Sequence, residues 1–395
     1  MERMLSSNSN KVRIFQQTFK GRTDVVPRHY KSKDGKKQGY SPLCRNEWKD
    51  GICNKPCRTC SNTDYIPLSY TIILDHLKGN HIIGLYPLLK NNTCHFIAAD
   101  LDNHDNARNP LKDVQALYEI CQVQGIPLYI LRSKSGKGYH CFIFFVDPVP
   151  AWKARLIYFA LLKEAQIIGD HIKLSSFDRL FPNQDEHSGK GFGNLIALPF
   201  QGQAAQKGHT LLLDPTSDFA EPYKDQWREL DHIEKISEST LDDLINQWDL
   251  RREPSVNGNG YKYSSGNNGK GREKILSCDF VKWCKEQPEK VPEPLWYPLI
   301  SNVICVRPGG YSLCHELSKG YPGYSVSETD AKIHQALDSS GPHTCEYIRA
   351  NGFKCDRECE VKSPAALLFN NGDPKREDKP KRARVSFAQG EGDHS

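Results

Sequence analysis

Apolar and polar residues follow the periods of strands and helices most clearly in the middle of the chain. Continuous apolar runs predict buried strands over residues 96–102, 128–131 and 140–146. Apolar residues recur at helical spacing over 109–124 and 151–168, so we expect two amphipathic helices there. The order strand, helix, strand, turn, strand, helix, strand predicts an α+β sandwich whose helices cover one face of the sheet.

The pattern changes outside this region and divides the chain into further parts. Residues 1–40 are basic and lack apolar periodicity, so we expect an arm that is disordered in part. The main domain is expected over 41–250, followed at 251–273 by a segment rich in Gly, Asn and Ser that is typical of a flexible linker. Short helical patterns over 274–370 predict a small, mainly helical domain, and the basic tail at 371–395 is expected to be disordered.

Composition narrows the class of protein only slightly. The 395 residues contain 53 Lys and Arg against 48 Asp and Glu, and this net charge of +5 permits nucleic-acid binding without requiring it. No apolar run reaches the roughly 18 residues of a membrane span, and the N-terminus lacks the apolar core of a secretory signal. We therefore expect a cytoplasmic protein with no membrane partner.

Two acids stand at the end of the first predicted strand, where residues two apart point to the same face. Asp100 and Asp102 would then lie side by side, and their like charges repel unless a cation lies between them. Asp178, which follows the second predicted helix, is a third acid, although Asp185 and Asp214 are alternatives. Such a group of carboxylates predicts a site for Mg²⁺ or Mn²⁺.

A glycine-rich turn leads into the strand at 140–146. Its glycines allow backbone N–H groups to approach an anion closely, and its basic side chains add positive charge. We expect it to hold a triphosphate, with His140 near the acids if the two strands are neighbours in one sheet. The residues expected to bind the nucleotide are Arg132, Ser133, Ser135, Gly136, Lys137, Gly138 and His140.

Three acids beside a phosphate-binding turn are what two-metal nucleotidyl transfer requires. Two other functions use part of this set: a catalytically silent subunit that binds single-stranded nucleic acid, and a metal-dependent nuclease. A nuclease does not need a triphosphate site, so the turn favours a polymerase. The sequence has no Gly-x-x-x-x-Gly-Lys-Ser/Thr loop, so we expect any helicase to be a separate protein.

Fourteen cysteines are many for a cytoplasmic protein, and they fall into two groups separated by a long stretch without any. In a reducing compartment such groups indicate metal sites more often than disulfides. The first group predicts a structural zinc site and the second predicts zinc or an iron–sulfur cluster, with unligated thiols as the alternative in both. The expected ligands are Cys44, Cys53, Cys57 and Cys60 in the first group, and Cys345, Cys355 and Cys359 with Cys284 or Cys278 in the second.

Several longer stretches of the sequence match the motifs of one protein family, in the same order. They are CRNEW at 44–48, IGLYPLL at 83–89, FDRLFPNQD at 177–185 and GFGNLIALP at 191–199. Together they resemble the primase domain of TOTE conflict systems and the related CRISPR-associated primase-polymerases, which belong to the archaeo-eukaryotic primase superfamily. The resemblance covers roughly residues 40–235.

The resemblance implies an RRM-like primase-polymerase core that makes primers on a single-stranded DNA template from nucleoside triphosphates. Asp100, Asp102 and Asp178 would bind two divalent ions, because the family's third motif is a hydrophobic residue followed by Asp. Ser135 and His140 would contact the nucleotide phosphates. The segment 274–370 resembles the small C-terminal helical domains of mobile-element primases, which help initiation. The choice between ribo- and deoxyribonucleotides, the ability to start chains, and the pathway served (mobile-element replication, a conflict system or CRISPR adaptation) stay open.

Overall fold

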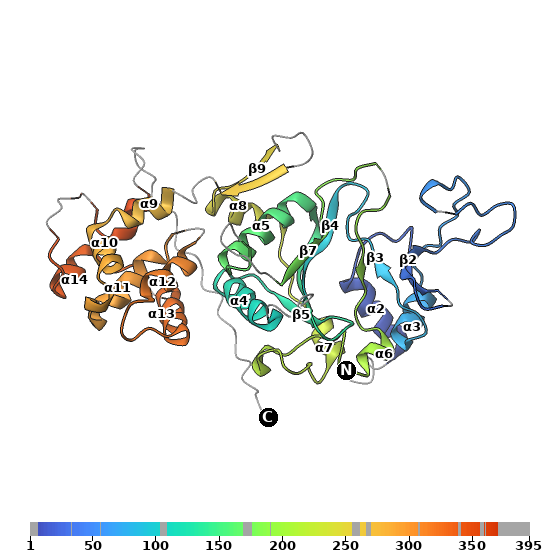
Figure 1. Ribbon diagram of the computed structural model, residues 1–395, viewed down its shortest axis with the longest axis horizontal. Coiled ribbons are helices and arrows are strands. Elements are labelled where there is room, and N and C mark those ends of the chain that lie inside the picture. The colour runs from blue at the N-terminus through green and yellow to red at the C-terminus, as the bar shows by residue number, and fades with distance from the viewer. Residues whose placement is uncertain are drawn as a thin grey trace, which may run out of the picture.

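The computed structural model contains an α+β part and a helical part, which lie side by side along the longest axis of the molecule (Figure 1). The helical part begins at residue 270 and lies nearest to α4 and α5 of the α+β part. The residues that the structure describes are 7–32, 34–55, 57–102, 109–168, 176–189, 191–254, 261–265, 270–306, 309–338, 341–355, 359 and 361–369. The basic tail expected at 371–395 therefore lies outside the described residues.

The centre of the α+β part is a four-stranded sheet with two helices. These elements follow one another in the order βαββαβ, which is the order of the ferredoxin-like fold. In space the strands are ordered β5, β6, β4, β7, and every neighbouring pair is antiparallel. The elements are β4 Thr93–Leu101, α4 Pro110–Val123, β5 Tyr129–Arg132, β6 Tyr139–Pro150, α5 Ala151–Glu164 and β7 Phe177–Phe181.

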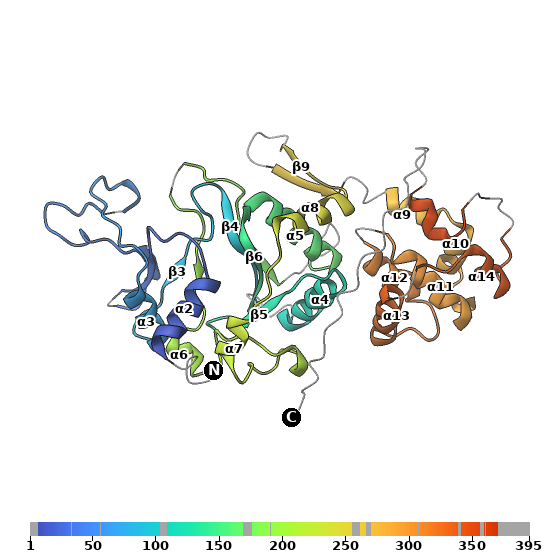
Figure 2. The ribbon, with the colours of Figure 1, turned by 180° about the vertical axis from the view of Figure 1, so that it is seen from behind.

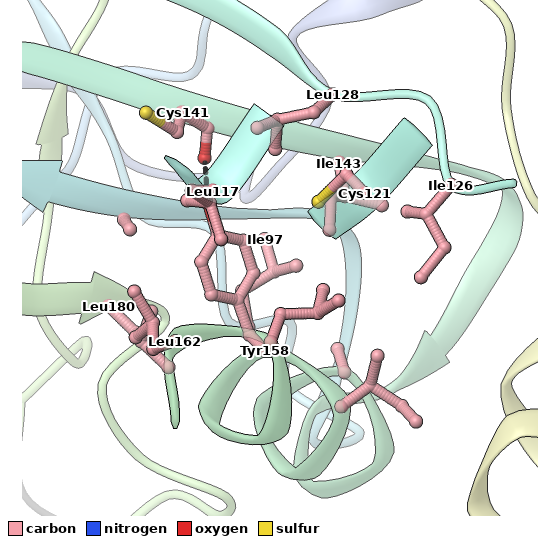
Figure 3. Close-up of a cluster of buried hydrophobic side chains, with 14 of the residues drawn as sticks. Ile97, Leu117, Cys121, Ile126, Leu128, Cys141, Ile143, Tyr158, Leu162 and Leu180 are labelled. Atoms are coloured by element: carbon pink, nitrogen blue, oxygen red, sulfur yellow. Dashed lines mark hydrogen bonds between the residues drawn. The ribbon is translucent and has the colours of Figure 1, made fainter. Parts of the chain in front are cut away.

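One face of this sheet packs against α4 and α5, as the periodicity predicted. Alternate residues of β4, including Ile97 and Ala99, point to this face and are fully buried with the apolar side of both helices. Tyr158 of α5 is also buried, and its hydroxyl donates a hydrogen bond to the backbone carbonyl of Cys141 on β6 at 2.7 Å (Figure 3). This bond satisfies a polar group that lies within an apolar layer.

The opposite face of the sheet is covered by the N-terminal segment. Helix α2 (Asn8–Thr18) lies next to α3 (Tyr70–Lys78), as Figure 2 shows from behind, and it buries Val12, Ile14 and Phe15. Phe19 follows the helix and packs against Phe142 and Phe144 of β6, with ring centroids 5.7 and 5.8 Å apart. Both faces of the sheet are therefore buried, except where the strands end.

The expectation of a partly disordered arm over residues 1–40 was wrong for most of that segment. Besides α2, it forms strand β1 (Pro27–Lys31), which pairs with β2 (Gln38–Pro42) in an antiparallel hairpin. The apolar residues of this segment are few, but they face an aromatic sheet surface that needs a cover, so tertiary packing outweighs the weak local pattern.

The expected linker at 251–273 also contains regular structure. Strands β9 (Leu250–Pro254) and β10 (Tyr261–Ser265) pair in an antiparallel hairpin, and α9 begins at Lys270. The remaining residues of the segment lie outside the described ranges. The other elements of the α+β part are β3 Gly84–Leu85, β8 Ile196–Ala197, α6 Gly202–Ala205, α7 Gln226–Asp231, α8 Glu238–Gln247 and the 3₁₀ turns Cys57–Thr59 and Pro215–Ser217.

The helical part has its own apolar core, centred on Trp296, whose indole N–H donates to the Ser318 hydroxyl at 2.9 Å. It meets the α+β part at Tyr311, whose backbone N–H donates to Glu164 of α5 and whose hydroxyl lies 3.0 Å from Glu119 of α4. None of the helices in the described part of the chain is long and apolar enough to cross a membrane. The elements are α9 Lys270–Leu276, α10 Asp279–Glu286, α11 Glu293–Val303, α12 Gly310–Ser318, α13 Val326–Asp338, α14 Cys345–Ala350 and the 3₁₀ turns Pro288–Lys290 and Pro364–Leu368.

Candidate active site

A row of polar side chains crosses three strands at one end of the central sheet. Asp100 on β4 is opposite His140 on β6 and opposite Arg179 on β7. The Nε2 atom of His140 lies 3.6 Å from Oδ1 of Asp100. The two strands are therefore neighbours in one sheet, which was the condition for the expected position of His140, and their register places His140 beside the first acid.

The electrostatics of this row follow from burial and from the other acids. Burial raises the pKa of Asp100, and the negative charges of Asp102 and Asp178 raise it further. Burial lowers the pKa of His140, against the opposing effect of Asp100 and Asp102. The ionised form of Asp100 is therefore destabilised, and a bound cation would relieve the repulsion from Asp102 and Asp178.

Asp178 lies within strand β7, which the sequence pattern did not reveal. Its Oδ2 accepts a hydrogen bond from Nε of Arg179 at 2.7 Å, and Arg179 also interacts electrostatically with Asp100. Arg179 was not among the predicted site residues. Its charge lies among the three acids and offsets part of their repulsion.

The donor set of the site consists of carboxylate oxygens, which are the ligands that Mg²⁺ and Mn²⁺ prefer. Asp100 and Asp102 lie two residues apart at the end of β4, and the Asp102 N–H donates to the Ser176 carbonyl at 2.7 Å, just before β7. In the described ranges, no three His, Cys, Asp or Glu side chains are already placed as ligands of one ion. The three aspartates suit the ions by chemistry, and rotation of their side chains is needed to bring them together.

The two alternative third acids are engaged elsewhere. Asp185 pairs with Arg155 at 2.8 Å and with Arg252 at 3.3 Å, where its side chain is largely buried. Asp214 accepts a hydrogen bond from the Thr216 N–H at 2.8 Å and so caps a 3₁₀ turn.

The glycine-rich turn is closed by its own serine hydroxyls. The Ser133 hydroxyl accepts from the Gly138 N–H at 3.1 Å, and the Ser135 hydroxyl accepts from the Lys137 N–H at 3.2 Å. The turn also lies against the second acid, since a Cβ atom at Gly138 would lie 3.0 Å from Oδ1 of Asp102 and 2.6 Å from the Leu101 carbonyl oxygen. The predicted phosphate-binding turn and the acids are therefore adjacent.

Arg132 is placed differently from the other predicted nucleotide-binding residues. It pairs with Tyr139, so its side chain points to the opposite face from His140. Its guanidinium donates to the Ala220 carbonyl at 2.7 Å. The structure thus groups His140 with the acids and directs Arg132 away from them.

Sequence reasoning also missed two residues beside the turn. His209 Nδ1 donates to the Lys134 carbonyl at 3.1 Å, and its ring lies so close that a Cβ atom at Gly136 would be 2.5 Å from Nε2. Thr210 has a positive φ of 57°, and its buried hydroxyl has no hydrogen-bond partner in the described part of the chain. Nothing in the local sequence marks either residue, because both reach the turn from a distant segment.

The first group of cysteines lies on the loop between β2 and α3. The sulfur of Cys44 accepts from the backbone N–H groups of Asn46 at 3.4 Å and Asp64 at 3.3 Å. The Lys55 ammonium lies 3.3 Å from the sulfur of Cys57. All fourteen cysteines fall within the described residues, and none of them forms a disulfide.

The second group differs from the expected ligand set at one position. Cys284 is fully buried in the apolar core of the helical part and does not line the pocket that Cys345, Cys355 and Cys359 share. Cys278, which was the alternative, lines a pocket together with those three cysteines.

A βαββαβ core with a row of acids beside a glycine-rich turn is the class of domain found in primases and polymerases of the archaeo-eukaryotic type. Residues 10–244 match the archaeo-eukaryotic primase domain of TOTE conflict systems. Since this match spans more than half of the chain, the chain belongs to that family, whose superfamily generally uses divalent metal ions.

Other comparisons add less. Among solved structures, the polymerase domain of Ligase D from Mycobacterium tuberculosis, in complex with DNA, is similar with 13% sequence identity and a TM-score of 0.32. That similarity covers 61% of this chain and 89% of the other. No curated protein matches the sequence.

Proposed function

We propose that this protein is a DNA primase or primase-polymerase that joins nucleoside triphosphates on a single-stranded DNA template. The observation that carries the proposal is the meeting of Asp100, Asp102 and Asp178 at the sheet end that also contacts the glycine-rich turn. A nuclease needs acids but no triphosphate site, so this adjacency favours nucleotidyl transfer over hydrolysis.

The residues of the site have separate roles in this proposal. Asp100, Asp102 and Asp178 hold two Mg²⁺ or Mn²⁺ ions, and Asp178 is preferred because Asp185 and Asp214 are held elsewhere. When bound, such ions activate the attacking 3′-hydroxyl and stabilise the leaving pyrophosphate. Ser133 and Ser135 receive the triphosphate, and their hydroxyls must first release the N–H groups of Gly138 and Lys137 that they bind in this structure.

His140 and Lys137 complete the nucleotide site. Because burial lowers the pKa of His140, its ring is neutral near pH 7 and can donate one hydrogen bond to a phosphate oxygen. Lys137 is exposed at the tip of the turn, and its flexible ammonium group supplies positive charge near the phosphates. Arg132 has no direct role, because it faces the other side of the sheet.

The proposal includes a structural zinc ion on Cys44, Cys53, Cys57 and Cys60. The two backbone N–H groups that point at the Cys44 sulfur support it, since such bonds stabilise a thiolate. The zinc would hold the long loop between β2 and α3, whose described residues form one short 3₁₀ turn and a bridge between Cys44 and Tyr65.

The test is primer synthesis by the full-length protein on single-stranded DNA, with labelled triphosphates and Mg²⁺ or Mn²⁺. We expect Asp102→Asn to abolish the product while binding of the template survives, because the change removes one charge and keeps the shape. Asp214→Asn is the matched control, since Asn also caps a helical turn well. It should retain the parental rate.

Two results would overturn the proposal. One is extension of primers by Asp102→Asn at the parental rate, which would exclude the metal assignment. The other is a parental protein that binds single-stranded DNA and incorporates no nucleotide with any triphosphate or either metal, which would indicate a silent binding subunit. Ribonucleotides and deoxyribonucleotides should be offered separately, because the geometry of the site does not distinguish them.

A further inference from the structure

Four cysteines from distant parts of the helical domain line one small pocket. Cys278 immediately precedes α10, Cys345 begins α14, and Cys355 and Cys359 follow α14 on the way to the last 3₁₀ turn. The pocket has a volume of about 20 Å³, and the rest of its lining is mainly apolar. Converging thiols in a site of this kind are the commonest arrangement of a structural metal site.

The segment that carries three of these cysteines has little structure of its own. Between residues 341 and 369, the described elements are the six-residue helix α14 and a five-residue 3₁₀ turn. One backbone bond, from the Cys345 N–H to the Lys362 carbonyl at 2.8 Å, joins its two ends. Such short elements are only marginally stable alone, so a cross-link to Cys278 through a metal ion would stabilise their folded conformation.

The four sulfurs are close enough to interact electrostatically. Cys278 interacts in this way with Cys355 and Cys359, and Cys345 interacts with the other three cysteines of the pocket.

We propose that Cys278, Cys345, Cys355 and Cys359 bind one Zn²⁺ ion, which fastens the C-terminal segment of the helical domain to α10. Soft thiolates in a set of four select zinc or iron. The pocket has room for about one water-sized particle, which fits a single ion. Since no three described ligand-type side chains are yet placed around one ion, the thiols must rotate inward to bind it.

The other cysteines of this domain have different surroundings. The Cys314 thiol donates to the Ile300 carbonyl at 3.7 Å, and the Cys305 thiol donates to the Ser301 carbonyl at 3.5 Å. Cys284 packs in the apolar core. Cys284 is therefore a matched control, because it lies on the helix that Cys278 precedes and contributes packing only.

The first experiment measures zinc and iron in the purified full-length protein by emission spectrometry. Cys278→Ser should lose one equivalent of zinc relative to the parent, and Cys284→Ser should lose none. Cys57→Ser serves to count the N-terminal zinc separately. Retention of the full zinc content by Cys278→Ser, or iron in place of zinc, would overturn the proposal.

The second experiment uses the parental protein and so does not depend on the folding of a variant. The protein is alkylated with N-ethylmaleimide with and without a strong zinc chelator, and the labelled cysteines are mapped by mass spectrometry. We expect Cys278, Cys345, Cys355 and Cys359 to become reactive together when zinc is withdrawn. Labelling of these four thiols at full rate before chelation would refute the site. Neither readout involves primer synthesis, so the result is independent of the proposed reaction.

Discussion

His140 lies directly opposite Asp100 across the pair of strands β4 and β6, with its Nε2 atom 3.6 Å from Asp100 Oδ1. This pairing fixes the imidazole between the acids and the glycine-rich turn. Because each residue belongs to a strand whose central part is buried, the sheet fixes the two backbone positions, while the side chains can still rotate.

The first prediction concerns His140. We expect His140→Ala to lower primer synthesis by about 100-fold or more, as removal of one positioned donor does at other sites where negative charge develops. The apparent KM for the triphosphate should rise as well, because the ring is proposed to contact phosphate. Steady-state incorporation at several triphosphate concentrations measures both. Exposed His81 is the control, and equal losses in His81→Ala would remove the special role of His140.

The second prediction concerns the contact between the turn and the acids. In Gly138→Ala the new methyl would meet the Leu101 carbonyl oxygen at 2.6 Å and Asp102 Oδ1 at 3.0 Å. We expect a loss of about 1–3 kcal/mol in the free energy of unfolding, together with lower activity, because the turn must move away from Asp102. Urea denaturation and primer synthesis check the two effects.

Gly271→Ala is the control for that substitution, since the nearest atom to its Cβ position is 3.6 Å away. It should keep the parental activity and stability. If Gly138→Ala behaved like Gly271→Ala, the close approach of the turn to the first motif would not matter for function.

The third prediction concerns pH and His76, which is fully buried. Its Nε2 donates to the Pro199 carbonyl at 2.8 Å, and its Nδ1 accepts from the Ile83 N–H at 3.3 Å. Burial lowers the pKa of His76 from 6.5 to about 4 in the folded protein. The unfolded state therefore takes up a proton first as the pH falls, and the contribution to stability present above pH 6.5 is lost as the pH falls towards 4.

The expected loss is about 3 kcal/mol, from the difference between the two pKa values. Unfolding midpoints between pH 7 and pH 4 measure it. His76→Gln should be less stable at pH 7 but should vary less with pH, whereas His81→Gln should follow the parent. A parental slope in His76→Gln would assign the pH dependence to other groups.

The sequence predicted three strands of the central sheet and the position of Asp100 and Asp102 at the end of one of them, for a physical reason. Asp100 and His140 lie on long apolar strands whose period of two assigns each side chain to one face, and Asp102 follows the last residue of β4. Asp178 was identified by its motif, but its strand β7 was not predicted, because it is only five residues long and its three central residues, Asp178, Arg179 and Leu180, include two charges.

Features that depend on distant segments could not be read from local pattern. Helix α2 forms because an aromatic sheet face lies above it, and His209 reaches the turn from another part of the chain. From the sequence alone, either Cys284 or Cys278 could be the fourth cysteine of the group. The fold shows that Cys284 lies in the apolar core and that Cys278 lines the shared pocket.

The fourth prediction concerns the N-terminal cysteine loop. If zinc is held there, Cys44→Ser should weaken the N–H bonds from Asn46 and Asp64 and loosen the loop. We expect faster cleavage by trypsin at Arg45 and Lys49, measured by mass spectrometry of early fragments. Cys121→Ser is the control, because Cys121 is buried beneath the sheet, far from the loop in the sequence. Equal cleavage rates in Cys44→Ser and the parent would contradict the zinc assignment.

The fifth prediction concerns the contact between the two parts of the molecule. The hydroxyl of Tyr311 lies within hydrogen-bonding distance of both Glu119 and Asp330, and it carries only one hydrogen to share between them. Burial raises the pKa of Glu119, and the charge of Asp330 raises it further. A carboxyl with a raised pKa in the folded state stabilises the protein while it is protonated, and that contribution is lost as the pH rises through its folded pKa.

Glu119→Gln replaces this carboxyl with a neutral group of the same shape that can donate to Asp330 or accept from Tyr311. We expect the variant to be more stable than the parent at pH 8 and close to it at pH 5, where Glu119 is more often protonated. Thermal unfolding at the two pH values tests this. Exposed Glu289→Gln is the control and should match the parent at both. If Glu119→Gln were less stable than the parent at pH 8, ionised Glu119 would be a partner that the contact between the two parts needs. The contact would then depend on the charge of Glu119 and not on its protonated form.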